Sequence, residues 1–418
     1  MGLFKKRKAT IEKAKIEQTH EIVCLYCFRN FNHDEVLFRA IAAMDVEGYR
    51  AQMDYILDDY RARFYMSSLG ELPPVLDPED FGEAHKGYLR GILSSLRDGH
   101  NNVSTKRLCP YCHNEIPGSA GFAPNTVVSI VGGSRAGKSV YLTSLIHTLK
   151  SVTSQNFDVF CTPISNEIGW KFKYEYEDPL IENGYPPFQK EELQEPLIFT
   201  FSFADGTKPE INIAFFDVAD DGMMDSGCMD IFAAHVRNSS GVMFLVDPMQ
   251  FRAIGHKVHM LNKMRYDPRT VRDPAEVLSG LVENYIYKQA NGISHVPTAV
   301  VLTKTDLLEA LSYEGEYVRQ RSNIFARYTH HGHLNLTETD IINYEVDEFI
   351  QRVDPNFRNA LKRRFANLGL FGVSALGAHP ELIRQRMAHF APVRVDEPFL
   401  WILYKLGYVD GFYEGARL

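Results

Sequence analysis

Short apolar runs rich in β-branched and aromatic residues recur along most of this chain and predict buried strands. They cover residues 126–131, 197–203, 211–217, 242–247, 296–302 and 368–373. A different pattern follows the first run, because residues 140–149 carry apolar side chains at 142, 145, 146 and 149, the spacing of one helix face. The run 197–203 alternates, turns at Asp205-Gly206 and is expected to pair with 211–217. Together these patterns predict an α/β fold with a mostly parallel sheet and flanking helices.

Two other stretches are less regular. Residues from about 151 to 196 show no sustained periodicity and are expected to be irregular. The segment 34–100 is expected to be helical, because Tyr49, Met53, Ile56 and Tyr60 recur at spacings of three or four residues. Its tail, residues 88–96, has a similar pattern.

The turn between the 126–131 strand and the 140–149 helix matches the phosphate-binding pattern G-x-x-x-x-G-K-[ST] in full. A strand–loop–helix order points backbone N–H groups and the positive end of a helix at a polyphosphate. We expect Lys138 to reach the β- and γ-phosphates and the Ser139 hydroxyl to ligate Mg²⁺. The alternative is a chance match in a glycine-rich turn. The expected phosphate-binding residues are Gly132, Gly133, Ser134, Arg135, Ala136, Gly137, Lys138, Ser139 and Val140.

Two later segments indicate guanine as the base. Thr303-Lys304-Thr305-Asp306 follows the 296–302 strand and looks like the [NT]-K-x-D motif of GTPases. The Asp306 carboxylate can accept from the ring N–H and the exocyclic amine of guanine, a donor pair that adenine lacks, so an ATPase is disfavoured. Ser374-Ala375-Leu376 follows the last strand and is similar to the S-A-K segment whose backbone N–H reaches the guanine carbonyl, with Leu376 where lysine is usual.

The elements for hydrolysis are less regular. Asp217 ends the 211–217 strand, the place expected for the carboxylate that holds the Mg²⁺ shell. The sequence then reads Val218-Ala219-Asp220-Asp221-Gly222, so a glycine stands at 222 instead of the usual 220, and Asp221 takes about the place of the water-orienting glutamine. No threonine lies between Pro163 and Phe199 to serve as the usual Mg²⁺-binding residue of switch I. Nucleotide binding is therefore better supported than fast hydrolysis, with Lys138, Asp217 and Asp221 as the candidate catalytic residues.

Four of the six cysteines form two C-x-x-C pairs, Cys24/Cys27 and Cys109/Cys112. Together they can supply four thiolates to one tetrahedral Zn²⁺, a closed arrangement typical of structural sites. A disulfide is disfavoured because the nucleotide motif suggests a reducing compartment and no signal peptide precedes the cysteines. A thioredoxin-like redox role is disfavoured because that motif uses one C-x-x-C pair in a βαβ unit. Cys161 and Cys228 are expected to be buried or incidental thiols.

Composition limits the remaining possibilities. The chain has 418 residues, 45% of them hydrophobic, and a net charge of −8, which gives no overall nucleic-acid signature. No run of about 18 apolar residues predicts a membrane span. Residues 1–20 are basic and could be a solvated tail or a helix that contacts a membrane surface or a partner. His330-His331-Gly332-His333 is expected to be an exposed loop and not a metal site. We expect a cytoplasmic protein.

Residues 126–418 resemble a TRAFAC-class P-loop GTPase through the segments Gly132–Ser139, Asp217, Thr303–Asp306 and Ser374–Ala375. The cysteine pairs and the large insert are similar in arrangement to the bacterial double-GTPase group of predicted conflict and defence systems. The resemblance implies binding of GTP, GDP and Mg²⁺, and partner proteins that include a second GTPase or an effector. We expect a basic tail (1–20), a zinc-ribbon-like module (21–118) with a helical insert (34–100), a linker (119–125) and a GTPase domain (126–418). Two functions remain open: a slowly hydrolysing switch, or a GTP-binding scaffold with negligible hydrolysis.

Overall fold

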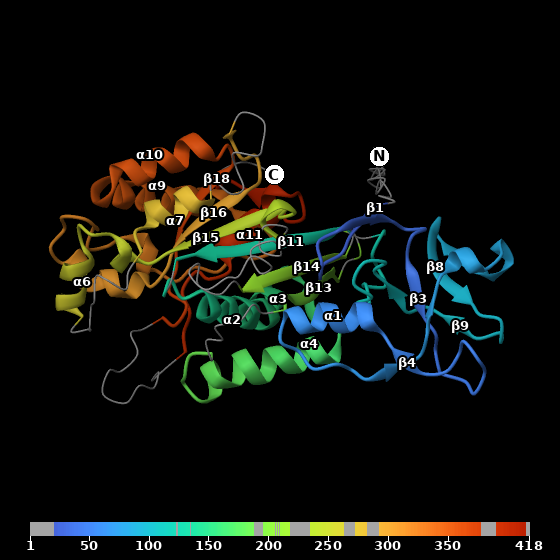
Figure 1. Ribbon diagram of the computed structural model, residues 1–418. Coiled ribbons are helices and arrows are strands. Elements are labelled where there is room, and N and C mark those ends of the chain that lie inside the picture. Colours follow the sequence, from blue (N-terminus) through green and yellow to red (C-terminus); the bar gives the residue numbers. More distant parts are fainter. Residues whose placement is uncertain are drawn as a thin grey trace, which may run out of the picture.

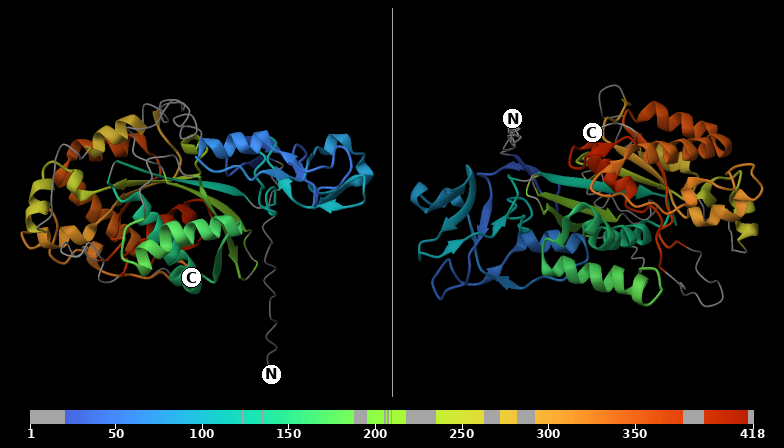
Figure 2. Two further views of the ribbon diagram at one scale, coloured as in Figure 1. Left: turned by 60° about the horizontal axis from the view of Figure 1, so that its bottom comes forward. Right: turned by 180° about the vertical axis from the view of Figure 1, so that it is seen from behind.

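The computed structural model describes residues 21–122, 124–133, 135–187, 195–204, 206, 208, 210–217, 235–262, 272–281, 292–377 and 390–414. A central sheet covered by helices makes up the larger part of the molecule, and a smaller module that carries the cysteine pairs lies at one end (Figures 1 and 2). Within the described ranges, no helix combines the length and apolarity needed to cross a bilayer.

Seven strands form the central sheet, in the order β12-β13-β14-β11-β15-β16-β18. β14, β11, β15, β16 and β18 pair in parallel, whereas β13 is antiparallel to both of its neighbours. The bounds are β11 Asn125–Gly132, β12 Val159–Pro163, β13 Leu197–Phe203, β14 Ile211–Asp217, β15 Gly241–Val246, β16 Thr298–Leu302 and β18 Leu368–Gly372. Each run predicted as a strand is present, so the expected mixed α/β architecture with a mostly parallel sheet is confirmed.

Alternate residues of the strands pack against helices on opposite faces of the sheet. Val127 and Val131 of β11 contribute to the core on one face, and Val128 and Ile130 to the core on the other. The first face carries α6 (Gly255–Leu261), α7 (Pro274–Leu281), α8 (Leu308–Ser312), α9 (Leu336–Val353) and α10 (Pro355–Arg364). The second carries α2 (Lys138–Thr148), α4 (Asn166–Lys171) with its π-helical continuation η4 (Phe172–Glu182), and α11 (Glu397–Lys405). The sheet is therefore the middle layer of three.

The stretch 151–196, expected to be irregular, is largely structured, and that expectation was wrong. It begins in the π-helical turn η3 (Leu149–Thr153) and continues through α3 (Ser154–Phe157), the edge strand β12, α4 and η4. η4 contains Pro179, which has no N–H to donate, so the π-helical hydrogen-bond pattern accommodates a residue that would interrupt an α-helix. The mixed helix types explain why a single periodicity is missing from the sequence.

The cysteine module is built mainly of short strands. They are β1 (Glu21–Val23), β2 (Asn30–Asn32), β3 (Leu37–Arg39), β4 (Gln52–Met53), β5 (Glu71–Leu72), β6 (Val75–Leu76), β7 (Lys86–Leu89), β8 (Ile92–Arg97), β9 (Val103–Ser104) and β10 (Arg107–Leu108). They pair as β1-β2, β10-β3-β6, β4-β5 and β7-β8-β9. One α-helix, α1 (Tyr55–Arg63), and two 3₁₀ turns, η1 (Pro78–Asp80) and η2 (Glu83–His85), complete the described part of the module.

The prediction of a helical insert was therefore wrong for most of its length. Residues 88–96 belong to the hairpin β7–β8, whose two-residue turn Arg90-Gly91 has φ of 51° and 83°. Positive φ at both central positions is the geometry that matches the twist of a hairpin. The periodic run 49–60 yields a helix only from Tyr55, where the Asp54 side chain accepts a hydrogen bond from Leu57 N–H and caps α1.

Short elements complete the remainder of the described chain. They are η5 (Pro248–Gln250), η9 (Thr305–Leu307), η10 (Asn323–Phe325) and the two-stranded ribbon of β17 (Leu334–Asn335) with β19 (Gly411–Phe412). Two of them, η5 and η9, directly follow strands of the central sheet and lie at its carboxyl edge.

Candidate functional site

The loop after β11 lies where the strand order of the sheet reverses. From β11 the chain passes to β12, β13 and β14 on one side of the sheet, and then to β15, β16 and β18 on the other. In open α/β sheets, ligands bind outside the carboxyl ends of the strands at such a switch point. The carboxyl ends of β11 and β15 are adjacent there, with Gly132 paired to Leu245. Residues 133–137 therefore occupy the position in this fold where a ligand is expected.

Steric constraints explain why glycines occupy positions 132, 133 and 137 of this loop. A Cβ on Gly132 would lie 2.7 Å from the carbonyl oxygen of Leu245, and one on Gly133 would lie 2.7 Å from Nε2 of Gln250. Gly137 has φ of 85° and is the residue before α2. The left-handed backbone there turns the chain directly into the helix, which begins at Lys138.

Lys138 is buried and turned back over the loop. Its Nζ donates to the carbonyl oxygens of Gly132 at 3.0 Å and Gly133 at 3.3 Å. Ser139, the predicted Mg²⁺ residue, is half-buried in the first turn of α2. Ser134 lies outside the described residues. The arrangement places a cation and a helix N-terminus beside one loop, which is the chemistry that a polyphosphate requires.

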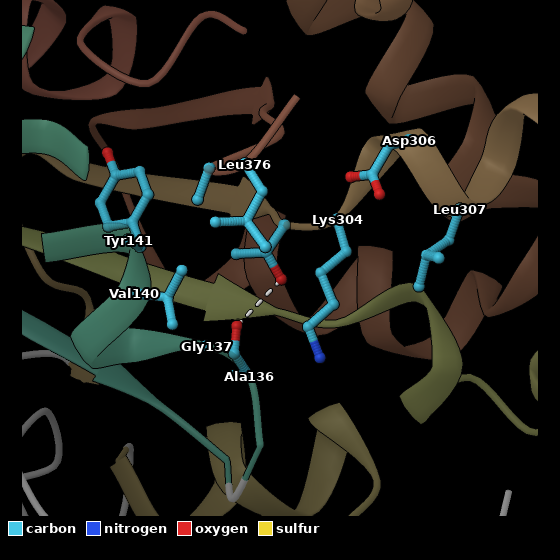
Figure 3. A pocket seen from close by; sticks show the side chains of 10 residues that line it. Ala136, Gly137, Val140, Tyr141, Lys304, Asp306, Leu307 and Leu376 are labelled. Carbon is cyan, nitrogen blue, oxygen red and sulfur yellow. Dashed lines mark hydrogen bonds between the residues drawn. The ribbon is translucent and has the colours of Figure 1, made fainter. Parts of the chain in front are cut away.

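Three predicted segments meet in one cavity of about 170 Å³. Apart from Tyr141 and Leu307, its lining residues are all among those expected to bind phosphate or base. The lining consists of Ala136, Gly137, Val140, Tyr141, Thr303, Lys304, Asp306, Leu307, Ala375 and Leu376 (Figure 3). The structure thus joins the loop after β11 to the segments that follow β16 and β18, far apart in the sequence.

Hydrogen bonds hold these segments together. Thr303 Oγ1 donates to the carbonyl oxygen of Ala136 at 3.0 Å, which ties the end of β16 to the loop after β11. Ser374 Oγ donates to the Asp306 carboxylate at 2.5 Å and accepts from Gly377 N–H at 2.9 Å. Ser144 of α2 donates to the carbonyl oxygen of Ala375 at 2.7 Å. The Asp306 carboxylate is therefore oriented by a neighbouring loop before any ligand arrives.

Asp247, at the end of β15, is a member of this site that the sequence analysis missed. Its carboxylate lies 2.5 Å from Nζ of Lys304, and Lys304 also donates to the carbonyl oxygen of Arg135 at 2.9 Å. Asp247 is buried and caps η5, because it accepts from Met249 N–H while its own N–H donates to Gln250. An acid at the carboxyl end of a predicted buried strand was the available signal.

The described part of the predicted hydrolytic segment ends at Asp217. The backbone of Asp217 ends β14 and pairs with Ile130 of β11, so it is beside the strand that precedes the phosphate loop. The region containing Asp220, Asp221 and Gly222 lies outside the described residues. The roles assigned to Asp217 and Asp221 stay predictions.

The four predicted zinc ligands form one group. The Sγ atoms of Cys24, Cys27, Cys109 and Cys112 all lie within 4.8 Å of one another. Cys24 Sγ is 3.7 Å from Cys112 Sγ, and Cys27 Sγ is 3.7 Å from Cys109 Sγ. Sulfur atoms at the vertices of a tetrahedron around zinc, with Zn–S bonds of about 2.3 Å, are about 3.8 Å apart. A disulfide needs about 2.05 Å. The spacing fits four ligands of one metal ion and excludes disulfides.

The two cysteine pairs adopt the same turn. Tyr26 N–H donates to Cys24 Sγ and Tyr111 N–H to Cys109 Sγ, each at 3.4 Å. The residue after each pair has positive φ, 59° at Phe28 and 55° at His113. Two such turns, which we call the first and second knuckles, face each other and present all four sulfur atoms to one point.

Charge in the cluster favours a bound cation. Burial raises the pKa of the Cys24 and Cys112 thiols, whereas hydrogen bonds from Cys109, Cys112 and Cys24 lower the pKa of Cys27. Four thiolates at this spacing require a cation, and sulfur ligands in a tetrahedron favour zinc.

A buried ion network braces the second knuckle. His113 Nδ1 lies 2.8 Å from Asp54 Oδ1, and Arg39 Nη2 lies 2.6 Å from Asp54 Oδ2. Burial opposes ionisation of Asp54, but hydrogen bonds from His113, Arg39 and Leu57 N–H together hold its pKa well below the usual range. The insert is therefore fixed to the cysteine cluster by polar contacts.

One residue of the histidine segment 330–333 is buried, although the whole segment was expected to be an exposed loop. His331 and His333 are exposed, as predicted, but His330 is buried, with Nδ1 accepting from Asn335 N–H and Nε2 3.2 Å from Glu397. Both ring nitrogens of His330 are engaged within the protein. Among the described residues, the cysteine cluster is the group with metal-ligand geometry.

Comparison with known proteins does not add an identity. The chain matches no protein-family profile, and no curated protein sequence is significantly similar to it.

Proposed function

We propose that this protein is a guanine-nucleotide-binding switch of the P-loop GTPase class, with a structural zinc site. The observation that carries the proposal is the cavity in which the loop after β11, Asp306 and Ala375 meet at the switch point of the sheet. A chance match of the glycine-rich turn to the phosphate-binding pattern would not account for the two predicted base-recognition segments beside it.

The residues present suit the expected ligand. Backbone N–H groups at the start of α2 and the Lys138 ammonium group would hold the phosphates. Asp306, held by Ser374, would accept from the donor edge of guanine, and the apolar lining by Val140 and Leu376 would contact the base. Ser139 and Asp217 would hold Mg²⁺, which offsets charge on the phosphates. Cys24, Cys27, Cys109 and Cys112 would hold zinc and supply folding energy to the module.

Lys138 must change partners on binding. Its Nζ donates hydrogen bonds to the carbonyl oxygens of Gly132 and Gly133, which are neutral acceptors. A phosphate would replace neutral acceptors with an anionic one, and hydrogen bonds between charged partners are roughly twice as strong.

Hydrolysis is proposed to be slow. No glutamine lies in the segment 218–222, and Asp221 stands at about the place of the water-orienting glutamine. A GTP-binding scaffold with negligible turnover is the second candidate, favoured by the same departure from the GTPase pattern. The resemblance to TRAFAC GTPases, and in arrangement to the bacterial double-GTPase group, further suggests a role with partner proteins in a defence or conflict system.

The test is equilibrium binding of fluorescent GTP and ATP analogues to the full chain with Mg²⁺, followed by phosphate release under saturating GTP. Tight GTP binding with weak ATP binding supports the proposal, and equal affinities contradict the assignment of guanine. Phosphate release above the buffer rate distinguishes the switch from the scaffold.

A further inference from the structure

The first knuckle packs directly against a strand of the nucleotide-binding sheet. The ring of Phe28, the residue after Cys27, lies edge-on to Phe216 of β14, with centroids 5.9 Å apart and an interplanar angle of 88°. The same ring lies 4.9 Å from that of His235, which is 4.3 Å from Phe216. All three side chains are buried. They form one aromatic cluster, here called the Phe28 contact.

The position of Phe28 depends on the cysteine cluster. Its φ of 59° is sparsely populated for a residue with a bulky side chain, and its N–H donates to the Cys24 carbonyl oxygen at 2.9 Å. Such a conformation persists only where the surrounding structure imposes it. The knuckle turn therefore aims the ring at β14, and an unfolded knuckle would release it.

The other side of the Phe28 contact leads to the phosphate loop. Phe216 immediately precedes Asp217, the predicted Mg²⁺ carboxylate, at the end of β14. Nε2 of His235 lies 2.9 Å from Oγ of Ser129 in β11. Ser129 is the residue that pairs with Phe216 in the parallel ladder of β11 and β14. β11 continues to Gly132, where the phosphate loop begins. One buried cluster thus touches both strands that end at the phosphate site.

His235 adds a reason for tight coupling at this point. Its Nδ1 is buried with no hydrogen-bond partner among the described residues, and burial lowers its pKa to about 3, so the ring is neutral. The ring is held by the contact of Nε2 with Ser129 and by packing against Phe28 and Phe216. Removing one of these rings leaves a cavity against groups that relax only in part.

A second route leaves the same knuckle. Tyr26, between the two cysteines, packs edge-on against Tyr60 of α1, with centroids 6.0 Å apart. The next residue of α1, Arg61, reaches Glu167 of α4 at 3.4 Å. α4 belongs to the stretch where the sequence places switch I. The first knuckle therefore contacts β14 directly and is linked to α4 through Tyr60 and Arg61.

We propose that zinc loading of the cysteine cluster and nucleotide occupancy are thermodynamically coupled, with the Phe28 contact carrying the coupling. The proposal rests on the proposed function. Because the contact supports the strand end that positions Asp217, zinc loading favours the triphosphate over the diphosphate. Coupling between two sites is reciprocal, so triphosphate must also slow the loss of zinc.

The experiment measures the affinities of a non-hydrolysable fluorescent GTP analogue and of a fluorescent GDP for the full chain. Each is measured with zinc bound and after removal by a zinc-selective chelator, at constant free Mg²⁺. We expect the preference for triphosphate to fall at least about five-fold on zinc removal, the lower end of typical allosteric coupling. We also expect zinc release to a chromogenic indicator to be slower with the GTP analogue than with GDP.

A pair of variants at equivalent positions localises the effect. Phe28→Ala removes the ring that reaches β14, whereas His113→Ala removes the side chain at the same place in the second knuckle, which contacts Asp54. Phe28→Ala should keep one zinc per chain and lose the dependence of zinc release on the nucleotide. His113→Ala should keep that dependence.

Each outcome decides the matter. Equal nucleotide preference with and without zinc overturns the coupling while leaving the proposed function intact. A wild-type chain that binds no guanine nucleotide overturns the proposed function and the coupling together. Should Phe28→Ala fail to fold, zinc release from the wild type with the two nucleotides decides alone, and equal rates contradict the proposal.

Discussion

The carboxylate of Asp247 lies 2.5 Å from the ammonium group of Lys304, which also donates to the carbonyl oxygen of Arg135. Lys304 has φ of 51°, a left-handed conformation that needs support from its surroundings. A buried acid from β15 therefore fixes a lysine from the segment after β16 against the phosphate loop. The Lys304 side chain thus joins the segments that follow β11, β15 and β16.

Asp247→Asn should weaken binding of the GTP analogue roughly ten-fold or more, because it removes a charged hydrogen bond worth about 1.5–3 kcal/mol. Asparagine retains an oxygen that can accept from Met249 N–H, so the cap of η5 survives. Asp273→Asn is the matched control, since Asp273 accepts from Ala275 N–H in a similar way. Unchanged affinity measured by fluorescence titration would show that Lys304 needs no such support.

Lys138→Ala should abolish nucleotide binding, because the phosphates would lose their main cation. The same titration measures the effect. Lys150→Ala is the control for loss of one positive charge, as Lys150 continues the same helical segment and pairs with Glu177 at 3.1 Å. Retained affinity in Lys138→Ala is incompatible with a phosphate site at this loop.

Asp306→Asn should weaken GTP binding and favour xanthosine triphosphate, because the side-chain amide presents a donor to the xanthine carbonyl. The lost charged hydrogen bond corresponds to about 1.5–3 kcal/mol. Asparagine can still accept from Ser374, so the loop contact is preserved. Competition between the two triphosphates measures the switch, and an unaltered order of affinities argues against recognition of the base by Asp306.

Purified protein should contain one zinc per chain, and Cys→Ser at position 24, 27, 109 or 112 should lower that content and destabilise the module. Elemental analysis and thermal unfolding are the measurements. Cys161→Ser is the control, because Cys161 lies in β12 away from the cluster, and burial raises its pKa to about 12. A well-folded preparation without metal refutes the zinc site.

Arg135 is an exposed residue of the phosphate loop with φ of 63°. If it acts on a nucleotide in a neighbouring copy, specific GTPase activity should rise with protein concentration, and Arg135→Ala should remove the rise. Lys304 contacts only the backbone oxygen of Arg135 in the hydrogen bond described, so the substitution leaves that bond in place. A flat wild-type profile leaves Arg135 as an ordinary loop residue.

Much of the sheet could be predicted because its strands are continuous apolar runs buried on both faces, such as Val242–Val246. Helix α2 and the cysteine group could be predicted because each depends on a short sequence pattern, the apolar spacing of residues 140–149 and the two C-x-x-C pairs. The cysteine module could not be predicted, since strands of two to four residues such as β4 and β7 are too short to show a periodicity. The hairpin turn Arg90-Gly91 lacks the Asn-Gly or Asp-Gly signature.

Side-chain partners within the site were only partly predictable. The meeting of Asp306 with Ser374 follows from two motifs that are each readable in the sequence. Asp247 and Phe28 carry no motif, because their importance comes from neighbours that the fold brings from distant segments. Contacts of this kind depend on register and packing, which the pattern of apolar residues leaves open.

The ligand pairs of the cysteine cluster have a consequence for the newborn chain. Cys27 and Cys109 are 82 positions apart. A metal ion at the first knuckle therefore has only two of its four sulfur ligands until the second knuckle has been synthesised. The metal then closes a long loop, whose entropic penalty grows only slowly with length. The contact of Phe28 with Phe216 forms later still, because Phe216 belongs to a strand that is synthesised after both knuckles. During translation, therefore, the first knuckle leaves the ribosome well before the two segments that complete its contacts.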